Sequence, residues 1–138
     1  MRDAVDGRIS HGLNASFAEG NAPVLGETKR QLGEYFRAER KHFELPLLLV
    51  GSDFQKRVWD ELRKVEYGET SSYLGLAERI GSKSAVRAVA SANGANAIAI
   101  IVPCHRIIGS KGELVGYAGG LKAKEKLLAL ECGLFALR

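Results

Sequence analysis

A long stretch without charged side chains, residues 88–105, limits the possible folds of this chain more than any other feature. It is apolar enough to be buried, but it also contains Ser91, Asn93, Gly94 and Asn96, and these residues exclude a membrane span. From the 138 residues we therefore expect one compact domain, or one domain with a short appendage.

The composition is that of a soluble globular protein, with 46% apolar and 26% charged residues. Asp3 and Asp6, with no apolar segment behind them, argue against a secretory signal. The two cysteines, Cys104 and Cys132, make neither a disulfide framework nor a zinc site with four ligands. We expect no metal, no membrane association and a reducing, cytoplasmic location.

The basic residues are unevenly placed, although the net charge is only +4. Residues 1–51 contain seven basic and seven acidic side chains, so they are neutral. Between Glu78 and Glu113 there is no acid, and five bases occur: Arg79, Lys83, Arg87, Arg106 and Lys111. Such a segment predicts a surface that faces a polyanion, unless the bases are merely solvated and clustered by chance.

The pattern changes at Gly51, which we take as the boundary between residues 1–50 and residues 51–138. In the first part we expect a short strand at 9–17, a helix at 25–41 and an extended apolar segment at 43–50. The second part opens with Ser52 and Gln55 at the spacing of a capping box. A helix is expected from there to about Glu66, with one apolar face formed by Phe54, Val58, Leu62 and Val65.

Two short helices follow, at 73–80 and 83–93, separated by Gly81. This layout is that of a helix-turn-helix, although a plain helical hairpin has the same pattern. The second helix carries Lys83 and Arg87 on an otherwise slim surface, which suits close approach to a nucleic acid groove. We further expect an extended run at 97–102, a hairpin at 107–115, and a last helix at 121–131 that buries Leu121, Leu127 and Leu128.

Cys104 is the candidate nucleophile, because it follows the apolar run and precedes His105 and Arg106. A thiol reacts as its thiolate, and an ordinary cysteine with a pKa of about 8.5 is mostly neutral at pH 7. A neighbouring imidazole that takes the proton, with a cation close by, is what an activated cysteine requires. The alternative is a small buried core residue, which is what most cysteines are. Cys132 has no comparable neighbours, and we interpret it as a passive thiol.

The segment from Asn96 to Arg106, which ends in Pro-Cys-His-Arg, closely resembles the acceptor site of the 6-O-alkylguanine-DNA alkyltransferases. Other segments resemble that family in the same order: Phe54–Trp59, Tyr67–Tyr73, Ala85–Val89, Gly116–Gly120 and Lys124–Glu131. The resemblance covers about residues 24–131. It implies an α+β fold, in which a truncated, ribonuclease-H-like sheet and helix part precedes a mainly helical, winged-helix-like domain with the helix-turn-helix.

The resemblance also implies a function, the repair of DNA by irreversible transfer of an alkyl group from O6 of guanine to Cys104. His105 would deprotonate Cys104 through a water, and Glu131 would orient the imidazole. Tyr73 would donate a proton to N3 of the guanine, and Asn96 would hold the active-site segment together. A thioether has no good leaving group, so the protein would act once, without a cofactor.

The partner that the resemblance implies is double-stranded DNA with an alkylated guanine flipped out of the stack; no protein partner is implied, and we expect a monomer. Arg87 would fill the gap in the duplex. Residues implied in DNA binding are Tyr73, Lys83, Ser84, Ala85, Arg87, Ala88 and Arg106. Residues implied in the substrate pocket are Asn93, Pro103, Ile107, Tyr117 and Ala118.

The chain departs from the family pattern in three places. Ala97 stands where the family usually has proline, and Ala118 replaces a hydroxyl residue found in some members, but neither removes a reacting group. The third departure is the short N-terminal part, where about fifty residues cannot hold the whole family domain. Some members bind zinc there, and no cysteine precedes Cys104 in this chain.

Three other functions fit parts of the sequence. A related damage-binding protein that transfers nothing would have the acceptor cysteine replaced, typically by tryptophan, and Cys104 is present. A helix-turn-helix regulator would explain Arg79 to Arg87 but would leave Cys104, His105 and Glu131 without a role. A cysteine hydrolase would explain the Cys-His pair and would release many products per protein molecule.

Overall fold

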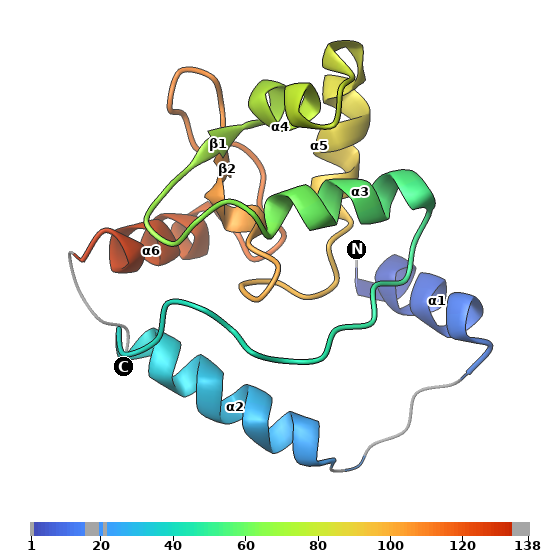
Figure 1. The fold of residues 1–138 in the computed structure, drawn as a ribbon, viewed down its shortest axis with the longest axis vertical. Helices are drawn as coiled ribbons and strands as arrows, with labels where there is room; N and C mark the ends of the chain where they lie inside the picture. Colours follow the sequence, from blue (N-terminus) through green and yellow to red (C-terminus); the bar gives the residue numbers. More distant parts are fainter. Residues whose placement is uncertain (1, 16–19, 21, 134–138) are drawn as a thin grey trace.

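The computed structural model describes residues 2–15, 20 and 22–133, and over these ranges the chain is a helix-rich α+β protein (Figure 1). The expected α+β class is therefore confirmed. In chain order the elements are α1 (Arg2–Leu13), α2 (Pro23–Phe36), α3 (Asp53–Leu62), β1 (Ser71–Ser72), α4 (Tyr73–Arg79), η1 (Lys83–Ala85), α5 (Val86–Gly94), η2 (Cys104–Arg106), β2 (Ile107–Ile108) and α6 (Leu121–Glu131).

The main core lies between α3, α4 and α5 and the segment that carries η2 and β2. Val58 and Leu62 of α3 are fully buried there, as are Leu76 of α4 and Val89 of α5. The indole of Trp59 donates a hydrogen bond of 2.9 Å to the carbonyl of Ala92, which ties α3 to α5. Three amphipathic helices thus form a scaffold on which the later segments pack.

Two helix starts in this scaffold, those of α3 and α4, lie where the sequence predicts them, whereas the helix expected from residue 83 begins as α5 at Val86, after the short turn η1. At α3 the Ser52 hydroxyl accepts from the amide of Gln55, and the Gln55 side chain accepts from the amide of Ser52. The Ser72 hydroxyl caps α4 by accepting from the amide of Gly75. These contacts satisfy amides that a helix leaves without partners at its start, so the capping serines fix where each helix begins.

The small sheet joins two segments that are distant in sequence. Strand β1 pairs with β2 in parallel, with Ser71 opposite Ile107 and Ser72 opposite Ile108. Because β1 leads directly into α4 and β2 directly follows η2, this short ladder holds the start of α4 beside the turn that contains Cys104.

A second cluster of buried side chains connects α2 with α6. Tyr35, Leu127 and Leu130 form its centre, and Phe43 and Tyr67 pack against it. Figure 1 shows α2 at one end of the molecule and the α4–α5 pair at the other, with α6 between them. The second cluster is therefore one link between the N-terminal part and the rest of the protein; Arg8, which donates to the carbonyl of Ala95, and Leu47 and Leu49, which pack on the main core, are others.

The structure corrects several expectations for the first fifty residues. The strand expected at 9–17 is wrong, because residues 9–13 belong to α1, and 16–19 lie outside the described residues. The helix expected at 25–41 ends at Phe36, because Ala38 takes a φ of 60° and leaves the helical region. Among the described residues up to 50 there is no strand, and the expected partial sheet is not found there. A strand needs a neighbour to pair with, and the extended segment at 43–50 has none in the described part of the chain.

Two further expectations, in the second half, are also wrong. The run 97–102 is not a strand but a sequence of bends with one bridge between Ala99 and Val102, and Ile100 has a φ of 73°. The hairpin expected at 107–115 does not form, because β2 pairs with β1 instead. The last helix has the expected bounds, but it exposes Leu121 and buries Lys124, Leu127, Leu130 and Glu131.

No helix in the described ranges combines the length and the apolar character that a membrane crossing requires.

Candidate active site

Cys104 begins η2, directly after Pro103, and its side chain lies in the core with only 7% of the residue exposed. Its backbone amide donates to the carbonyl of Val102 at 2.8 Å. The Asn96 side chain bridges the preceding bend, donating to the carbonyl of Val102 at 2.8 Å and accepting from the amide of Ile98 at 3.0 Å. These bonds close the segment before Cys104 into a fixed loop and so set the position of the thiol.

The surroundings of Cys104 act on its proton in opposite directions. Burial raises the pKa of the thiol, because a thiolate is poorly solvated in the core. The Asn96 side chain and the positive charge of Lys124 partly offset this rise. At neutral pH the group is therefore mainly a thiol, and it needs a base to become a nucleophile.

His105 lies next in the chain and is fully buried. Its Nε2 is 2.7 Å from Oε1 of Glu131, the last residue of α6. Its Nδ1 is buried and has no hydrogen-bond partner among the described residues. A neutral imidazole that donates through Nε2 keeps Nδ1 as an acceptor, so the ring can take a proton on that side.

Glu131 stays charged although its side chain is almost completely buried. Burial acts to raise its pKa, but hydrogen bonds from His105 and Arg106 outweigh burial and hold the pKa at about 2. Arg106 donates to both carboxylate oxygens at 2.9 Å, and the hydroxyl of Tyr35 donates to Oε1 at 2.7 Å. The carboxylate is thus anchored from η2 and from α2 at the same time.

A pocket of about 410 Å³ opens beside Cys104. Its walls come from α4, α5, the loop before η2 and the glycine-rich loop before α6; they include Tyr73, Ala90, Asn93, Asn96, Cys104, Gly116, Tyr117 and Ala118. Of the five residues expected in a substrate pocket, Asn93, Tyr117 and Ala118 are therefore together with the thiol. The volume and the mixed apolar and polar lining suit a small organic ligand.

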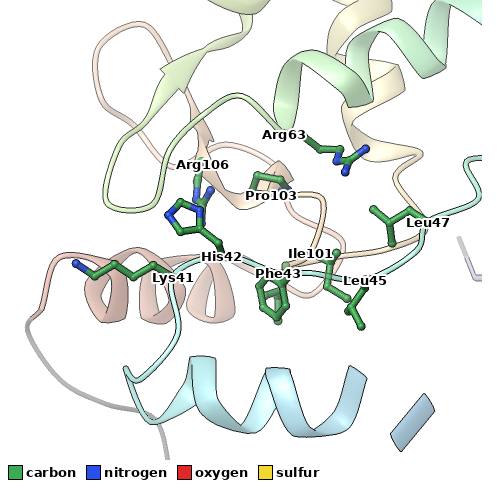
Figure 2. A pocket seen from close by; sticks show the side chains of 10 residues that line it. Lys41, His42, Phe43, Leu45, Leu47, Arg63, Ile101, Pro103 and Arg106 are labelled. Carbon is green, nitrogen blue, oxygen red and sulfur yellow. The ribbon is translucent and has the colours of Figure 1, made fainter. Parts of the chain in front are cut away.

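Two expected pocket residues do not line this cavity. Ile107 is fully buried, and its carbonyl accepts from the ammonium group of Lys124. Pro103 lies on the wall of a separate, smaller pocket of about 140 Å³ (Figure 2). Figure 2 shows this second pocket between the extended segment after α2 and the segment before η2, with Lys41, His42, Arg63 and Arg106 around it.

Tyr73 and Tyr117 face the pocket with protonated hydroxyls. Burial, followed by the neighbouring Cys104, raises the pKa of Tyr73 and brings that of Tyr117 to about 12. The Tyr73 hydroxyl donates to the carbonyl of Val115 at 2.9 Å. Both phenols remain proton donors at neutral pH, within the cavity that holds the thiol.

The expected DNA-binding residues divide into two groups. Lys83, Ser84, Arg87 and Ala88 are exposed, and Ala85 is half-buried, on η1 and α5. Arg106 is wrong as a DNA contact, because it is buried and bonded to Glu131 and to the carbonyl of Val65. The resemblance of the Pro-Cys-His-Arg segment implied that Arg106 contacts DNA, whereas its guanidinium group binds the carboxylate of Glu131 inside the protein.

Sequence reasoning gave no role to two residues that build the site. The ammonium group of Lys124 is buried and donates to the carbonyls of Ile107, Val115 and Gly116. Its spacing from Leu127 and Glu131 on one helix face could have indicated burial. Tyr35 falls at the spacing of the apolar face of its helix, which indicates burial, but nothing local indicates its bond to Glu131, which lies 96 residues further along the chain.

In the described part of the chain, His, Cys, Asp and Glu side chains do not come together in a group of three or more that could hold a metal ion.

Comparison with known proteins gives one consistent answer. The family profile described as "6-O-methylguanine DNA methyltransferase, DNA binding domain" matches residues 53–133. A methylated-DNA–protein-cysteine methyltransferase of Mycolicibacterium paratuberculosis is 57% identical over 111 residues, which are 80% of this chain and 67% of that protein. The protein of the same name from Methanosarcina acetivorans is 51% identical over 111 residues, or 80% of this chain and 71% of the relative.

A solved structure agrees with these relatives. The crystal structure of Mycobacterium tuberculosis OGT in complex with DNA superposes with a TM-score of 0.79 at 50% identity. The superposition covers 80% of this chain and 69% of that one. The chain thus spans about two thirds of the length of the proteins it matches.

Proposed function

Because the chain belongs to the 6-O-methylguanine-DNA methyltransferase family, a family of DNA-repair proteins that transfer an alkyl group to their own cysteine, we propose that Cys104 is the acceptor in this protein. The single observation that carries this proposal is the buried thiol in the wall of the 410 Å³ pocket, next in the chain to a histidine bonded to a buried carboxylate. Cys132 is exposed and, although it follows Glu131, it has no histidine next to it in the chain.

The transfer is an in-line displacement. His105 takes the proton of the Cys104 thiol through a water, and Glu131 stabilises the imidazolium that forms. The thiolate sulfur then attacks the methyl carbon, the bond from that carbon to O6 breaks, and its electron pair stays on the guanine oxygen. The product is a thioether, which has no good leaving group, so each protein molecule reacts once and needs no cofactor.

The departing guanine needs hydrogen-bond donors to leave as a neutral base. Tyr73 turns from the carbonyl of Val115 and supplies its phenol proton to N3, and the phenolate that this leaves takes a proton back from water. The backbone amide of Ala118 donates to the guanine oxygen. Asn96 is the residue that keeps the segment before Cys104 in shape. Proton donors on the base and an acceptor for the thiol proton therefore face each other across one pocket.

DNA is the partner of this protein, and α4 with η1 and α5 is the part that contacts it as a helix-turn-helix of the winged-helix type. The exposed small residues of α5 suit the minor groove, and Arg87 fills the space that the flipped base leaves. The protein acts as a monomer in the compartment that holds the DNA. Residues 1–50 form an N-terminal part, and residues 51–138 form the DNA-binding methyltransferase domain.

The test is mass spectrometry of the protein after incubation with a duplex that carries one 6-O-methylguanine. The expected result is a gain of one methylene on the peptide that contains Cys104, with the guanine restored. Cys104→Ser should bind the duplex as the unchanged protein does and transfer nothing, whereas the matched variant Cys132→Ser should react normally. An adduct elsewhere than Cys104, or several products per protein molecule, would refute the proposal.

A further inference from the structure

A buried phenol from the N-terminal part reaches the carboxylate of the proposed active site. Tyr35 lies near the end of α2, outside the residues that match the family profile, and is fully buried. Its hydroxyl donates to Oε1 of Glu131 at 2.7 Å. The same oxygen is bonded to Nε2 of His105, also at 2.7 Å.

We propose that Tyr35 is a positioning residue for methyl transfer, which holds Oε1 of Glu131 and thereby fixes the orientation and the proton affinity of His105. This inference rests on the function proposed above, in which His105 takes the proton of Cys104. Tyr35 touches neither the substrate nor the thiol in this account; it acts through Glu131 alone.

The geometry makes Tyr35 and His105 share one oxygen. Oε1 of Glu131 accepts from three groups, Tyr35, His105 and Nη2 of Arg106, whereas Oε2 accepts from Nε of Arg106. A hydrogen-bond donor to a carboxylate oxygen partly neutralises the negative charge of that oxygen. Each donor therefore weakens the hydrogen bonds that the same oxygen accepts from the other donors. The phenol therefore reduces the pull of Glu131 on the imidazole.

Tyr35 is a permanent donor in this position. Burial and the negative charge of Glu131 raise the pKa of the phenol far above its ordinary value, so the hydroxyl keeps its proton. The ring is held on three sides by Phe36, Phe43 and Tyr67, with ring centroids 5.5 to 6.1 Å away. The hydroxyl has little freedom to turn to another acceptor.

Other charged and titratable groups also lie around Glu131, and they influence its carboxylate together with Tyr35. Arg106 and His105 face it from η2, Tyr35 from α2, and Tyr67 from the segment between α3 and β1. Arg106 also lies 5.8 Å from the ring of Tyr67. The bonds of Arg106 to Glu131 do not involve the Tyr35 hydroxyl, so Tyr35→Phe removes one donor from Oε1 and leaves His105 and Arg106 as its donors.

The experiment compares Tyr35→Phe with Phe43→Leu in the full chain. Phe43→Leu disturbs the same aromatic cluster without removing the hydroxyl, so it reports what packing alone does. Single-turnover rates of methyl transfer are measured against pH, with duplex DNA carrying 6-O-methylguanine and with the free alkylated base. We expect Tyr35→Phe to slow both reactions about fivefold at neutral pH, the effect of one hydrogen bond, and to move the acid limb of the profile to higher pH.

A second change at position 35, which strengthens the hydrogen-bond donor instead of removing it, tests the proposal if Tyr35→Phe folds poorly. Incorporation of 3-fluorotyrosine at position 35 leaves the ring in place and makes the phenol a stronger donor, which should move the acid limb to lower pH. Binding of the duplex should not change in any of these proteins, because α2, the helix that contains Tyr35, lies at the opposite end of the molecule from α5 (Figure 1).

Titration of the His105 ring nitrogens by NMR separates this inference from the proposed function. Loss of the Tyr35 hydroxyl is expected to change the pH at which the His105 ring titrates, whether or not the protein transfers a methyl group. An unchanged His105 titration in both Tyr35 proteins, or equal rate losses in Tyr35→Phe and Phe43→Leu with unchanged profiles, would overturn the inference. An unreactive wild-type protein whose His105 titration moves as expected would overturn the proposed function and leave the Tyr35 contact supported.

Discussion

At the scale of single residues, the site depends on keeping a charge in the core. The carboxylate of Glu131 would be protonated in an apolar surrounding, but Arg106, His105 and Tyr35 donate to its oxygens. Cys104 and His105 could be found from the sequence because they are neighbours. Glu131 came only from the resemblance, and Tyr35 not at all, because contacts across 96 residues leave no local pattern.

Replacing Glu131 by Gln should destabilise the protein by about 3 kcal/mol at neutral pH, since Arg106 would stay buried without its counter-charge. The pKa of Glu131 is about 2 in the folded protein against an ordinary 4.5. Its contribution is therefore complete above about pH 4.5 and is lost as the pH falls from there towards 2.

Urea denaturation of the two proteins at several pH values measures this difference. It should be constant from about pH 5 to 7 and should shrink steadily at lower pH. Glu125→Gln, at an exposed position on the same helix, serves as the control and should unfold like the wild type. A difference between Glu131→Gln and wild type that persists unchanged near pH 3 would contradict the ion-pair explanation.

At the scale of elements, the helices after residue 51 were predicted better than the strands, whereas α1 was missed altogether. Ser52 and Ser72 mark helix starts through bonds to amides three residues away, and such local chemistry is written in the sequence. The segment 97–102 has strand composition, but Asn96 bends it and no neighbour pairs with it along its length. The partner of β2 is likewise set by packing and not by the turn that follows it.

Lys124 acts at this scale, because one side chain joins α6 to β2 and to the loop at 115–116. Lys124→Met should cost about 2–4 kcal/mol of stability, since three carbonyls would lose their common donor. It should also slow methyl transfer, because that loop lines the pocket beside Cys104. Thermal unfolding and single-turnover kinetics measure the two effects.

Lys122→Met, two residues earlier and exposed, is the matched control for Lys124→Met. It should leave both quantities near the wild-type values. If Lys124→Met unfolds and reacts like Lys122→Met, the ammonium group does not hold the loop.

At the scale of the whole molecule, the surface of α5 and the pocket have to serve one substrate. Arg87 is exposed on α5, and Ala90 and Asn93 of the same helix line the pocket. One helix therefore has Arg87 on its exposed face and Ala90 and Asn93 on the wall of the pocket. The basic residues between Glu78 and Glu113 do not all lie on the surface. Arg106 is buried, whereas Lys83 and Arg87 are exposed.

Arg87→Ala should slow repair of 6-O-methylguanine in a duplex by about tenfold or more, since the energy of unstacking a base is no longer offset. Attack on the free alkylated base should be almost unchanged, because that reaction needs no flipping. Arg37→Ala, at the residue that directly follows α2, is the control for lost positive charge, because α2 lies at the other end of the molecule from α5 (Figure 1). Equal losses on both substrates would argue against Arg87 as the side chain that fills the gap.

The contact between Tyr35 and Glu131 has a consequence for the time at which the protein becomes reactive. Proteins are made from the N-terminus, and a ribosome covers the most recent part of the chain. The helix that carries Tyr35 emerges early, and the thiol of Cys104 emerges well before Glu131, the last residue of α6. In the mechanism proposed above, Glu131 orients His105, so a chain that has not yet formed α6 has its cysteine without that carboxylate. The thiol would then gain its reactivity only after α6 has been made and has packed against α2.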